Sequence, residues 1–164
     1  MHTISIILIE AAEYLDSIDQ SLWRYEELVP EQILSDVISG MYYLAYVGDK
    51  ALGTLRYQIQ DPIFWPEISD NRSAFIHRLA VKREAASKGV ASQMLSWAKE
   101  QTKSIDRDFL RLDCAVRPKL CAIYEQNGFS KHSECLVGSY HVVRYETDVT
   151  KCEQAVAANR DSRD

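Results

Sequence analysis

The residues most suited to chemistry lie where an apolar stretch ending at Val81 gives way to small and basic side chains. Three small residues stand where a helix is expected to begin: Gly89, Ala91 and Ser92. Three basic residues accompany them: Lys82, Arg83 and Lys88. A helix N-terminus presents unpaired backbone N–H groups and the positive end of the helix dipole, and small side chains let a phosphate approach that backbone. The turn is therefore predicted to bind a phosphate or pyrophosphate group.

The same turn differs from two commoner phosphate-binding motifs. It contains neither GxGxxG nor GxxxxGK followed by Ser or Thr. A strand-to-helix turn often carries a glycine without binding anything, so the residues alone also leave an unliganded turn open.

The cysteines indicate neither a metal site nor a disulfide framework. Four occur, and they form no CxxC pair and no Cys/His cluster with zinc spacing: Cys114, Cys121, Cys135 and Cys152. We therefore expect reduced thiols, no metal and a cytoplasmic protein.

His77 is the candidate general base. It lies on the strand expected to end at the phosphate-binding turn, and imidazole titrates near neutral pH. Glu67, in the preceding loop, is a second candidate, and an ordered water could relay the proton instead. A histidine satisfied by its neighbours in the strand is the purely structural alternative.

The pattern of apolar and polar residues predicts the elements that position these side chains. Strands are predicted at 2–10, 41–47, 51–60, 73–81, 109–116, 129–132 and 139–149. Helices are predicted at 11–25, 31–39, 87–104 and 119–126, with a loop at 61–72. The order β-α-α-β-β-β-α-β-α-β-β contains a βαβ unit with hairpins on both sides, so the predicted fold class is α/β with a mixed central sheet flanked by helices. The predicted organisation is one domain at 1–150 and a polar tail at 151–164.

Charge and hydropathy exclude several classes of protein. The 164-residue chain has a formal net charge of −5, and residues 1–76 hold only 4 Lys and Arg against 12 Asp and Glu. An acidic protein binds nucleic acid poorly, because phosphate contacts supply most of that affinity. The apolar runs are shorter than the roughly 18 residues that a membrane span needs. We expect neither nucleic acid nor a membrane as a partner.

Two motifs together resemble those of the GCN5-related N-acetyltransferases, the GNAT superfamily. The family's acyl-coenzyme-A motif has Arg or Gln, two variable residues, Gly, one variable residue and then Gly or Ala. Here it falls on 86–91, where Gly89 and Ala91 match and Ala86 departs. The sequence IYEQNGF at 123–129 is similar to the family's YE-x-x-GF signature. Residues 74–129 carry the resemblance, which implies a GNAT-type single domain.

The resemblance implies direct transfer of an acetyl group from acetyl-coenzyme A to a primary amine. The cofactor-binding residues that it implies are Leu79, Ala80, Val81, Ser87, Lys88, Gly89, Val90, Ala91, Ser92 and Arg117. Among these, Arg117 stands where many members carry an Asn. Tyr124 matches the tyrosine that donates a proton to the departing thiolate. Members that acetylate arylalkylamines place a histidine at the position of His77.

The acceptor is expected to be a small-molecule amine. Its site should draw on the first helices, the 61–72 loop and residues 133–140, which bring aromatic and acidic side chains: Trp23, Tyr25, Glu26, Glu27, Phe64, Trp65 and Glu67. Three alternatives stay open: a peptide or protein amine as acceptor, a longer acyl chain, and a coenzyme-A-binding regulatory module without turnover. Edge strands near the C-terminus are compatible with a homodimer.

Overall fold

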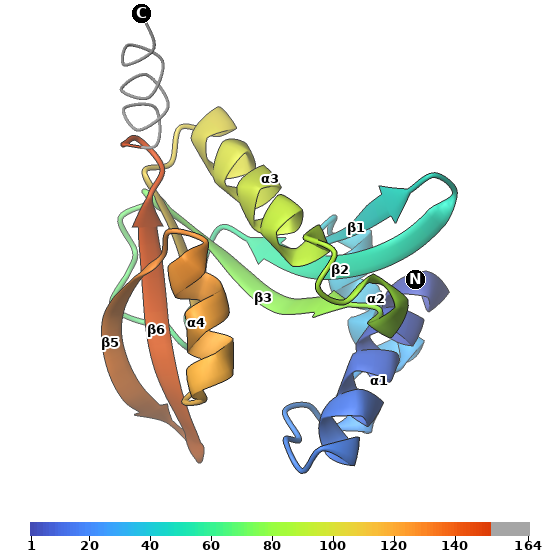
Figure 1. Cartoon of the computed structure of the whole chain (residues 1–164). Helices are drawn as coiled ribbons and strands as arrows, with labels where there is room; N and C mark the ends of the chain where they lie inside the picture. Colours follow the sequence, from blue (N-terminus) through green and yellow to red (C-terminus); the bar gives the residue numbers. More distant parts are fainter. Residues whose placement is uncertain (152–164) are drawn as a thin grey trace, which may run out of the picture. The chain divides into compact units, whose positions relative to one another are not determined.

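A computed structural model of the chain describes residues 1–151 (Figure 1). Cys152 and the rest of the predicted polar tail lie outside the described residues. The helices are α1 (His2–Ser17), α2 (Pro30–Ile38), α3 (Val90–Ser104) and α4 (Pro118–Gln126). Short 3₁₀ turns occur at Tyr25–Glu27 and Arg83–Ala85. The strands are β1 (Tyr42–Val47), β2 (Lys50–Gln58), β3 (Ser73–Val81), β4 (Phe109–Ala115), β5 (Ser130–Val137) and β6 (Tyr140–Asp148).

The strands form one six-stranded sheet in the order β1-β2-β3-β4-β6-β5. β1 and β2 pair antiparallel, as do β4 with β6 and β5 with β6. The predicted α/β class, with a mixed open sheet flanked by helices, is confirmed. The strands and helices from β1 onward agree with their predicted order.

The chain divides into two compact units. Unit 1 comprises Met1–Gln58 and Ile76–Ser96, and unit 2 comprises Ile59–Phe75 and the chain from Trp97 onward. β3 and α3 each pass from one unit into the other. Each unit is described separately below.

Unit 1 begins with a helix where the sequence predicts a strand. Residues 3–9 are rich in β-branched side chains, which favour strands, but α1 covers the whole segment. The side chains of Ile4, Ile7 and Leu8 recur at helical spacing, and each is at most 4% exposed. They pack in one core cluster with Leu28 and Ile33. Burial of this helical face outweighs the local strand propensity, so the predicted N-terminal strand is wrong.

The predicted helix at 11–25 is also wrong in its extent. α1 ends at Ser17, and Asp19 follows with a left-handed φ of 55°. Short polar residues such as Asp tolerate that conformation, which cannot continue a helix. The chain then runs to the 3₁₀ turn at Tyr25–Glu27, where the Tyr25 hydroxyl donates to the Asp16 carboxylate.

Unit 2 combines the β4-β6-β5 ladder with α4 and the segment 59–72. Arg144 on β6 fixes this segment: its guanidinium donates to the Phe64 carbonyl at 3.1 Å and pairs with Glu67 at 2.6 Å. Trp65 is fully buried and lies 6.1 Å, ring to ring, from Phe75. The predicted loop is therefore held to the rest of unit 2 by contacts at Phe64, Trp65 and Glu67.

Among the described residues, every helix is too short or too polar to cross a membrane.

Candidate functional site

The predicted phosphate-binding turn lies in unit 1, between the end of β3 and the start of α3. Two residues of this turn have left-handed backbone angles, Ser87 with φ 61° and Gly89 with φ 79°. These angles stop the chain from continuing as a regular strand or helix, so α3 begins at Val90 rather than at Ser87 as predicted. Ser87, Lys88 and Gly89 are all exposed.

The backbone of this turn offers donors to a ligand. The first hydrogen bond that enters α3 runs from the Gln93 N–H to the Gly89 carbonyl, at 3.0 Å. The N–H groups of Val90, Ala91 and Ser92 precede it and have no helical partner, as at any helix start. A Cβ placed on Gly89 would meet no atom within 4 Å, so the space above this glycine is open. A fifteen-residue helix begins here and adds its dipole.

Gly53 on β2 fixes where α3 begins. A Cβ at this position would lie 2.7 Å from the Met94 sulfur, 3.2 Å from the Ala80 carbonyl oxygen and 3.3 Å from Val90. Only a residue without a side chain lets the first turns of α3 approach β2 and β3 this closely. Gly53 is not among the predicted site residues, although a glycine inside a predicted strand is a signal for close approach.

The basic residues around the turn do not contribute equally. Lys88 is exposed beside Gly89. The Arg83 guanidinium instead lies 3.6 Å from the centre of the Tyr14 ring, and the Arg83 N–H donates to Glu10 at 2.8 Å. Arg83 therefore ties the loop to α1, which leaves Lys88 as the exposed cation next to Gly89.

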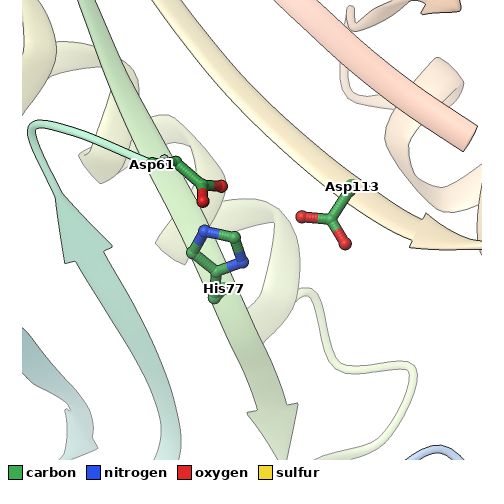
Figure 2. A group of neighbouring side chains, drawn as sticks. All are labelled: Asp61, His77 and Asp113. Atoms are coloured by element: carbon green, nitrogen blue, oxygen red, sulfur yellow. The ribbon is translucent and has the colours of Figure 1, made fainter. Parts of the chain in front are cut away.

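β3 carries the other predicted residues of unit 1. His77 and Leu79 are half-buried, Ala80 is buried and Val81 is half-buried before the turn. The residues predicted to bind pantetheine and the turn predicted to bind pyrophosphate therefore lie on consecutive parts of one unit. Figure 2 labels His77 on β3, Asp61 on the segment after β2 and Asp113 on β4.

Unit 2 contains Tyr124, which the sequence predicts as the general acid. Tyr124 lies on α4, is 8% exposed and packs edge-on against Phe129 with ring centres 6.1 Å apart. Burial, followed by the negative charges that nearby ionisable groups can carry, raises the pKa of Tyr124 above its usual value near 10. Across residues 1–151 its hydroxyl makes no hydrogen bond, whereas the neighbouring Tyr145 hydroxyl donates to Glu125 at 2.7 Å.

The remaining residues of the IYEQNGF motif hold Tyr124 in place. Gly128 has φ 80° and ends α4, and the Phe129 N–H donates back to the Tyr124 carbonyl at 3.1 Å. The Lys99 ammonium donates to the Asn127 carbonyl. Arg117, predicted to contact the cofactor, is half-buried at the N-cap of α4.

Unit 2 also brings two carboxylates together. One oxygen of Asp61 and one of Asp113 lie within 4.8 Å of each other. Asp61 is 3% exposed, and one of its oxygens accepts the N–H groups of Ile63 and Phe64 at 3.2 and 3.1 Å. Carboxylates are ligands for hard cations, but such a site needs more ligands than these two oxygens, so we assign no metal here.

Two predicted acceptor residues have other surroundings than expected. Trp65, predicted to help form the acceptor site, lies in the core of unit 2, with the guanidinium groups of Arg144 at 4.6 Å and Arg111 at 5.5 Å from its ring centre. Glu67, the second candidate base, is exposed and paired with Arg144. A cavity of about 210 Å³ lies beside Trp65, smaller than the roughly 300 Å³ of the smallest common ligand pockets.

Comparisons with known proteins agree with these motifs. The sequence matches the Acetyltransferase (GNAT) family over residues 8–129. It is 24% identical over 157 residues to an uncharacterized N-acetyltransferase of Bacillus subtilis, YesJ, which covers 90% of this chain and 84% of that protein.

Solved structures share the fold. The PaiA N-acetyltransferase of Thermoplasma acidophilum, in complex with coenzyme A, is similar with a TM-score of 0.70 and 18% identity, over 89% of this chain and 92% of that one. AAC(6')-Ib, in complex with paromomycin and acetyl-coenzyme A, is similar with a TM-score of 0.66 and 17% identity, over 92% of each chain. Taken with the family match, which spans well over half of the sequence, these findings show that the chain belongs to the GNAT family of acetyltransferases and is an N-acetyltransferase.

Proposed function

We propose that this enzyme transfers the acetyl group of acetyl-coenzyme A directly to a primary amine of a small molecule. The observation that carries the proposal is the turn at 87–92, where open space above Gly89 meets unpaired N–H groups at the start of α3. Main-chain donors at a helix N-terminus are suited to a pyrophosphate, and the exposed Lys88 adds positive charge. The residues present therefore fit coenzyme A.

Acetyl-coenzyme A, when bound, supplies an acyl group on a thiol leaving group. Tyr124 is proposed to donate its phenolic proton to the departing sulfur as the carbon–sulfur bond breaks and the carbon–nitrogen bond forms. Its raised pKa keeps the phenol protonated at neutral pH, and its hydroxyl is not committed to another group of the described chain. Main-chain groups of Leu79 to Val81 are proposed to hold the pantetheine arm.

His77 is proposed to accept the proton that the amine loses. It is half-buried on β3, two residues before Leu79. We expect His77→Gln to lower kcat/KM about 100-fold near neutral pH, within the usual range for loss of a general base. The loss should shrink as the pH rises toward the pKa of the amine, since the ammonium proton that must be removed before the attack is then already lost to the solvent. A steady-state pH profile checks this, and a loss that is equal at every pH would contradict the role.

A small-molecule acceptor is supported by the acidic balance of the first half of the chain, which suits a cationic substrate. AAC(6')-Ib, which shares the fold, has been crystallised with the aminoglycoside paromomycin. A first panel therefore holds an arylalkylamine, a polyamine and an aminoglycoside: tyramine, spermidine and kanamycin. Release of the coenzyme A thiol reports turnover of each.

The decisive test is calorimetric titration with coenzyme A and with acetyl-coenzyme A on the wild type and on Gly89→Glu. The substitution fills the open space above Gly89 and adds a negative charge, so we expect the dissociation constant to rise by about 100-fold or more. Gly48→Glu is the matched control, because Gly48 lies in the β1–β2 turn with φ 59°, and a Cβ placed on it would likewise meet no atom within 4 Å. Gly48→Glu adds the same side chain, with the same charge and a similar backbone strain, away from the turn at 87–92.

Each outcome of the titration separates the candidate functions. Binding by the wild type and by Gly48→Glu, with loss in Gly89→Glu, supports the turn as the cofactor site. A wild type that binds neither ligand contradicts the proposal. A wild type that binds both but turns over no amine favours the regulatory coenzyme-A-binding module, and turnover of peptide amines alone favours a protein acceptor.

A further inference from the structure

Arg78 on β3 has a backbone conformation that its residue type does not explain. Its φ is 51°, in the left-handed region, although it lies inside a strand. Within residues 1–151 the other non-glycine residues with positive φ lie outside the strands: Asp19, Asn71, Ser87 and Asp106. Asp, Asn and Ser have short polar side chains that bond locally, whereas Arg gains nothing of the kind. Such a conformation persists only where the surroundings fix it.

The Arg78 guanidinium makes three contacts within unit 1. One nitrogen donates to the Glu27 carbonyl oxygen at 3.1 Å and to the Tyr42 hydroxyl oxygen at 3.2 Å. The other terminal nitrogen lies 3.7 Å from the Glu27 carboxylate. The Arg78 side chain is 22% exposed and the Glu27 side chain 44% exposed, so the guanidinium is sheltered more than the carboxylate it pairs with. We call this group, made of Arg78, Glu27 and Tyr42, the Arg78 clamp.

The clamp joins two parts of unit 1 that the proposed reaction uses. Glu27 ends the 3₁₀ turn between α1 and α2, within the segment 18–29 that is expected to help bind the acceptor amine. Two hydrogen bonds join this segment to α1: the Ser5 hydroxyl donates to the Leu28 carbonyl at 2.5 Å, and the Tyr25 hydroxyl donates to Asp16. Leu28 also lies in the core cluster that contains Ala80 of β3. Arg78, next to His77, ties the same segment to β3.

We propose that Arg78 is a positioning residue for the acceptor amine: its guanidinium holds the segment 18–29 against the strand that carries His77. The left-handed φ at Arg78 interrupts the regular alternation of β3, as in a β-bulge, and directs the side chain toward Glu27 and Tyr42. Arg78 itself takes no part in bond making or proton transfer. This inference rests on the proposed acetyl transfer.

The test compares Arg78→Ala, Arg78→Gly and Arg78→Lys with Lys50→Ala. Lys50 lies in unit 1 outside the segment 18–29, and its exposed side chain is 3.8 Å from Glu84, so its removal makes the same change in charge without touching the clamp contacts. Steady-state rates are measured with acetyl-coenzyme A and with whichever of tyramine, spermidine and kanamycin the wild type acetylates. Acetyl-coenzyme A affinity is measured by calorimetry.

We expect Arg78→Ala and Arg78→Gly to raise the KM for the amine by at least about tenfold, with the acetyl-coenzyme A dissociation constant changed less than about threefold. Arg78→Lys keeps a cation that can make one of the contacts, so its KM should lie between these variants and the wild type. Lys50→Ala should stay within about twofold of the wild type, because an exposed ion pair contributes little.

Three results would overturn the proposal. One is an amine KM in Arg78→Ala equal to that of Lys50→Ala. Another is recovery of the wild-type KM in Arg78→Gly, since glycine relieves the backbone strain without restoring the guanidinium. The third is an equal loss of acetyl-coenzyme A affinity. Hydrogen exchange gives a further check: amides of 18–29 should exchange faster in Arg78→Gly than in Lys50→Ala, and equal rates would also overturn the clamp.

Failure of the proposed function is distinguishable from failure of this inference. The first appears in the wild type, as absence of coenzyme A binding. The second appears only in the comparison of the Arg78 variants with Lys50→Ala. Should Arg78→Ala fail to fold, Arg78→Gly and Arg78→Lys decide the question, because glycine accepts the backbone angle and lysine keeps the charge.

Discussion

Unit 2 contains two buried tyrosines whose hydroxyl groups differ in their hydrogen bonding. Tyr124 and Tyr145 lie with ring centres 6.1 Å apart, and burial raises the pKa of both. The Tyr145 hydroxyl donates to Glu125, and this hydrogen bond joins β6 to α4. The Tyr124 hydroxyl has no such bond within the described chain, so it is the one of the pair that is available to a ligand.

We expect Tyr124→Phe to lower kcat by about 100-fold, because a general acid contributes about this much to a rate. Coenzyme A affinity should change little, since the phenol acts on the leaving sulfur rather than on the pyrophosphate. Tyr145→Phe is the matched control, which removes a hydroxyl of the same chemistry from the same cluster. A similar kcat in both variants would contradict the assignment of Tyr124.

The raised pKa of Tyr124 also fixes the direction of its pH effects. The neutral phenol is favoured in the folded protein, so its stabilising contribution is complete below the unfolded pKa of about 10 and changes only as the pH rises beyond it. Above that pH the unfolded chain ionises more readily than the folded one, so folding loses stability. For the same reason the loss of kcat in Tyr124→Phe should be constant from neutral pH up to about 10. A kcat profile of wild type and variant measures this.

Residue identities predict some of the candidate site and miss the rest for a physical reason. Gly89 and Tyr124 can be predicted from their neighbours in the sequence, because one is a glycine in an expected turn and the other belongs to a motif of fixed spacing. The role of Arg78 depends on Glu27 and Tyr42, which are distant in sequence and close only after folding. The prolines and acids around Trp65 predict an exposed side chain, yet the fold buries it completely.

At the scale of the element, α1 shows tertiary burial overriding local propensity. A strand would place alternate residues on one face, so that Ile4, Ile6 and Leu8 share one environment. The helix instead buries Ile7 completely and leaves Ile6 55% exposed. The two isoleucines are neighbours in sequence and opposite in surroundings, which makes them a matched pair.

We expect Ile7→Ala to lower the free energy of unfolding by about 2–4 kcal/mol, as for other large-to-small changes in a core. Ile6→Ala should stay within about 0.5 kcal/mol of the wild type, because its side chain is exposed and alanine is a better helix former. Urea denaturation at neutral pH measures both. An equal loss from the two substitutions would be the outcome expected of a buried strand and would contradict α1.

Several later elements agree well with prediction because their boundaries carry their own signals. β3 ends where basic residues begin, and α4 ends at Gln126, just before Asn127 and Gly128, where Gly128 adopts φ 80°. The strand predicted at 129–132 is too short, because β5 continues to Val137 in its pairing with β6. α3 is predicted to start at Ser87 but starts at Val90. The prediction misses this because the helical spacing of apolar residues gives no information on the left-handed φ of Gly89.

At the scale of the whole molecule, the structure has the class of fold that the sequence predicts. The α/β class follows from the βαβ unit around the predicted phosphate-binding turn, whose strand and helix periodicities are long and unambiguous. The N-terminal region, with its wrong strand, is the part whose local propensities conflict with its packing. The same region is expected to contact the acceptor, and it contains none of the residues that carry the family resemblance.

Both compact units are assembled from two separate stretches of chain, and this sets the order in which they can be completed during synthesis. Unit 1 lacks its second stretch until Ser96 has left the ribosome. The segment 59–75 emerges before that, but Arg107, Arg111 and Arg144, which contact it, are made later. Once Ser96 has been made, unit 1 has all of its residues. Unit 2, to which Trp65 and Phe75 belong, still lacks the stretch from Trp97 onward. A growing chain of this enzyme exposes an apolar, aromatic segment for that interval, which is the kind of surface that chaperones bind.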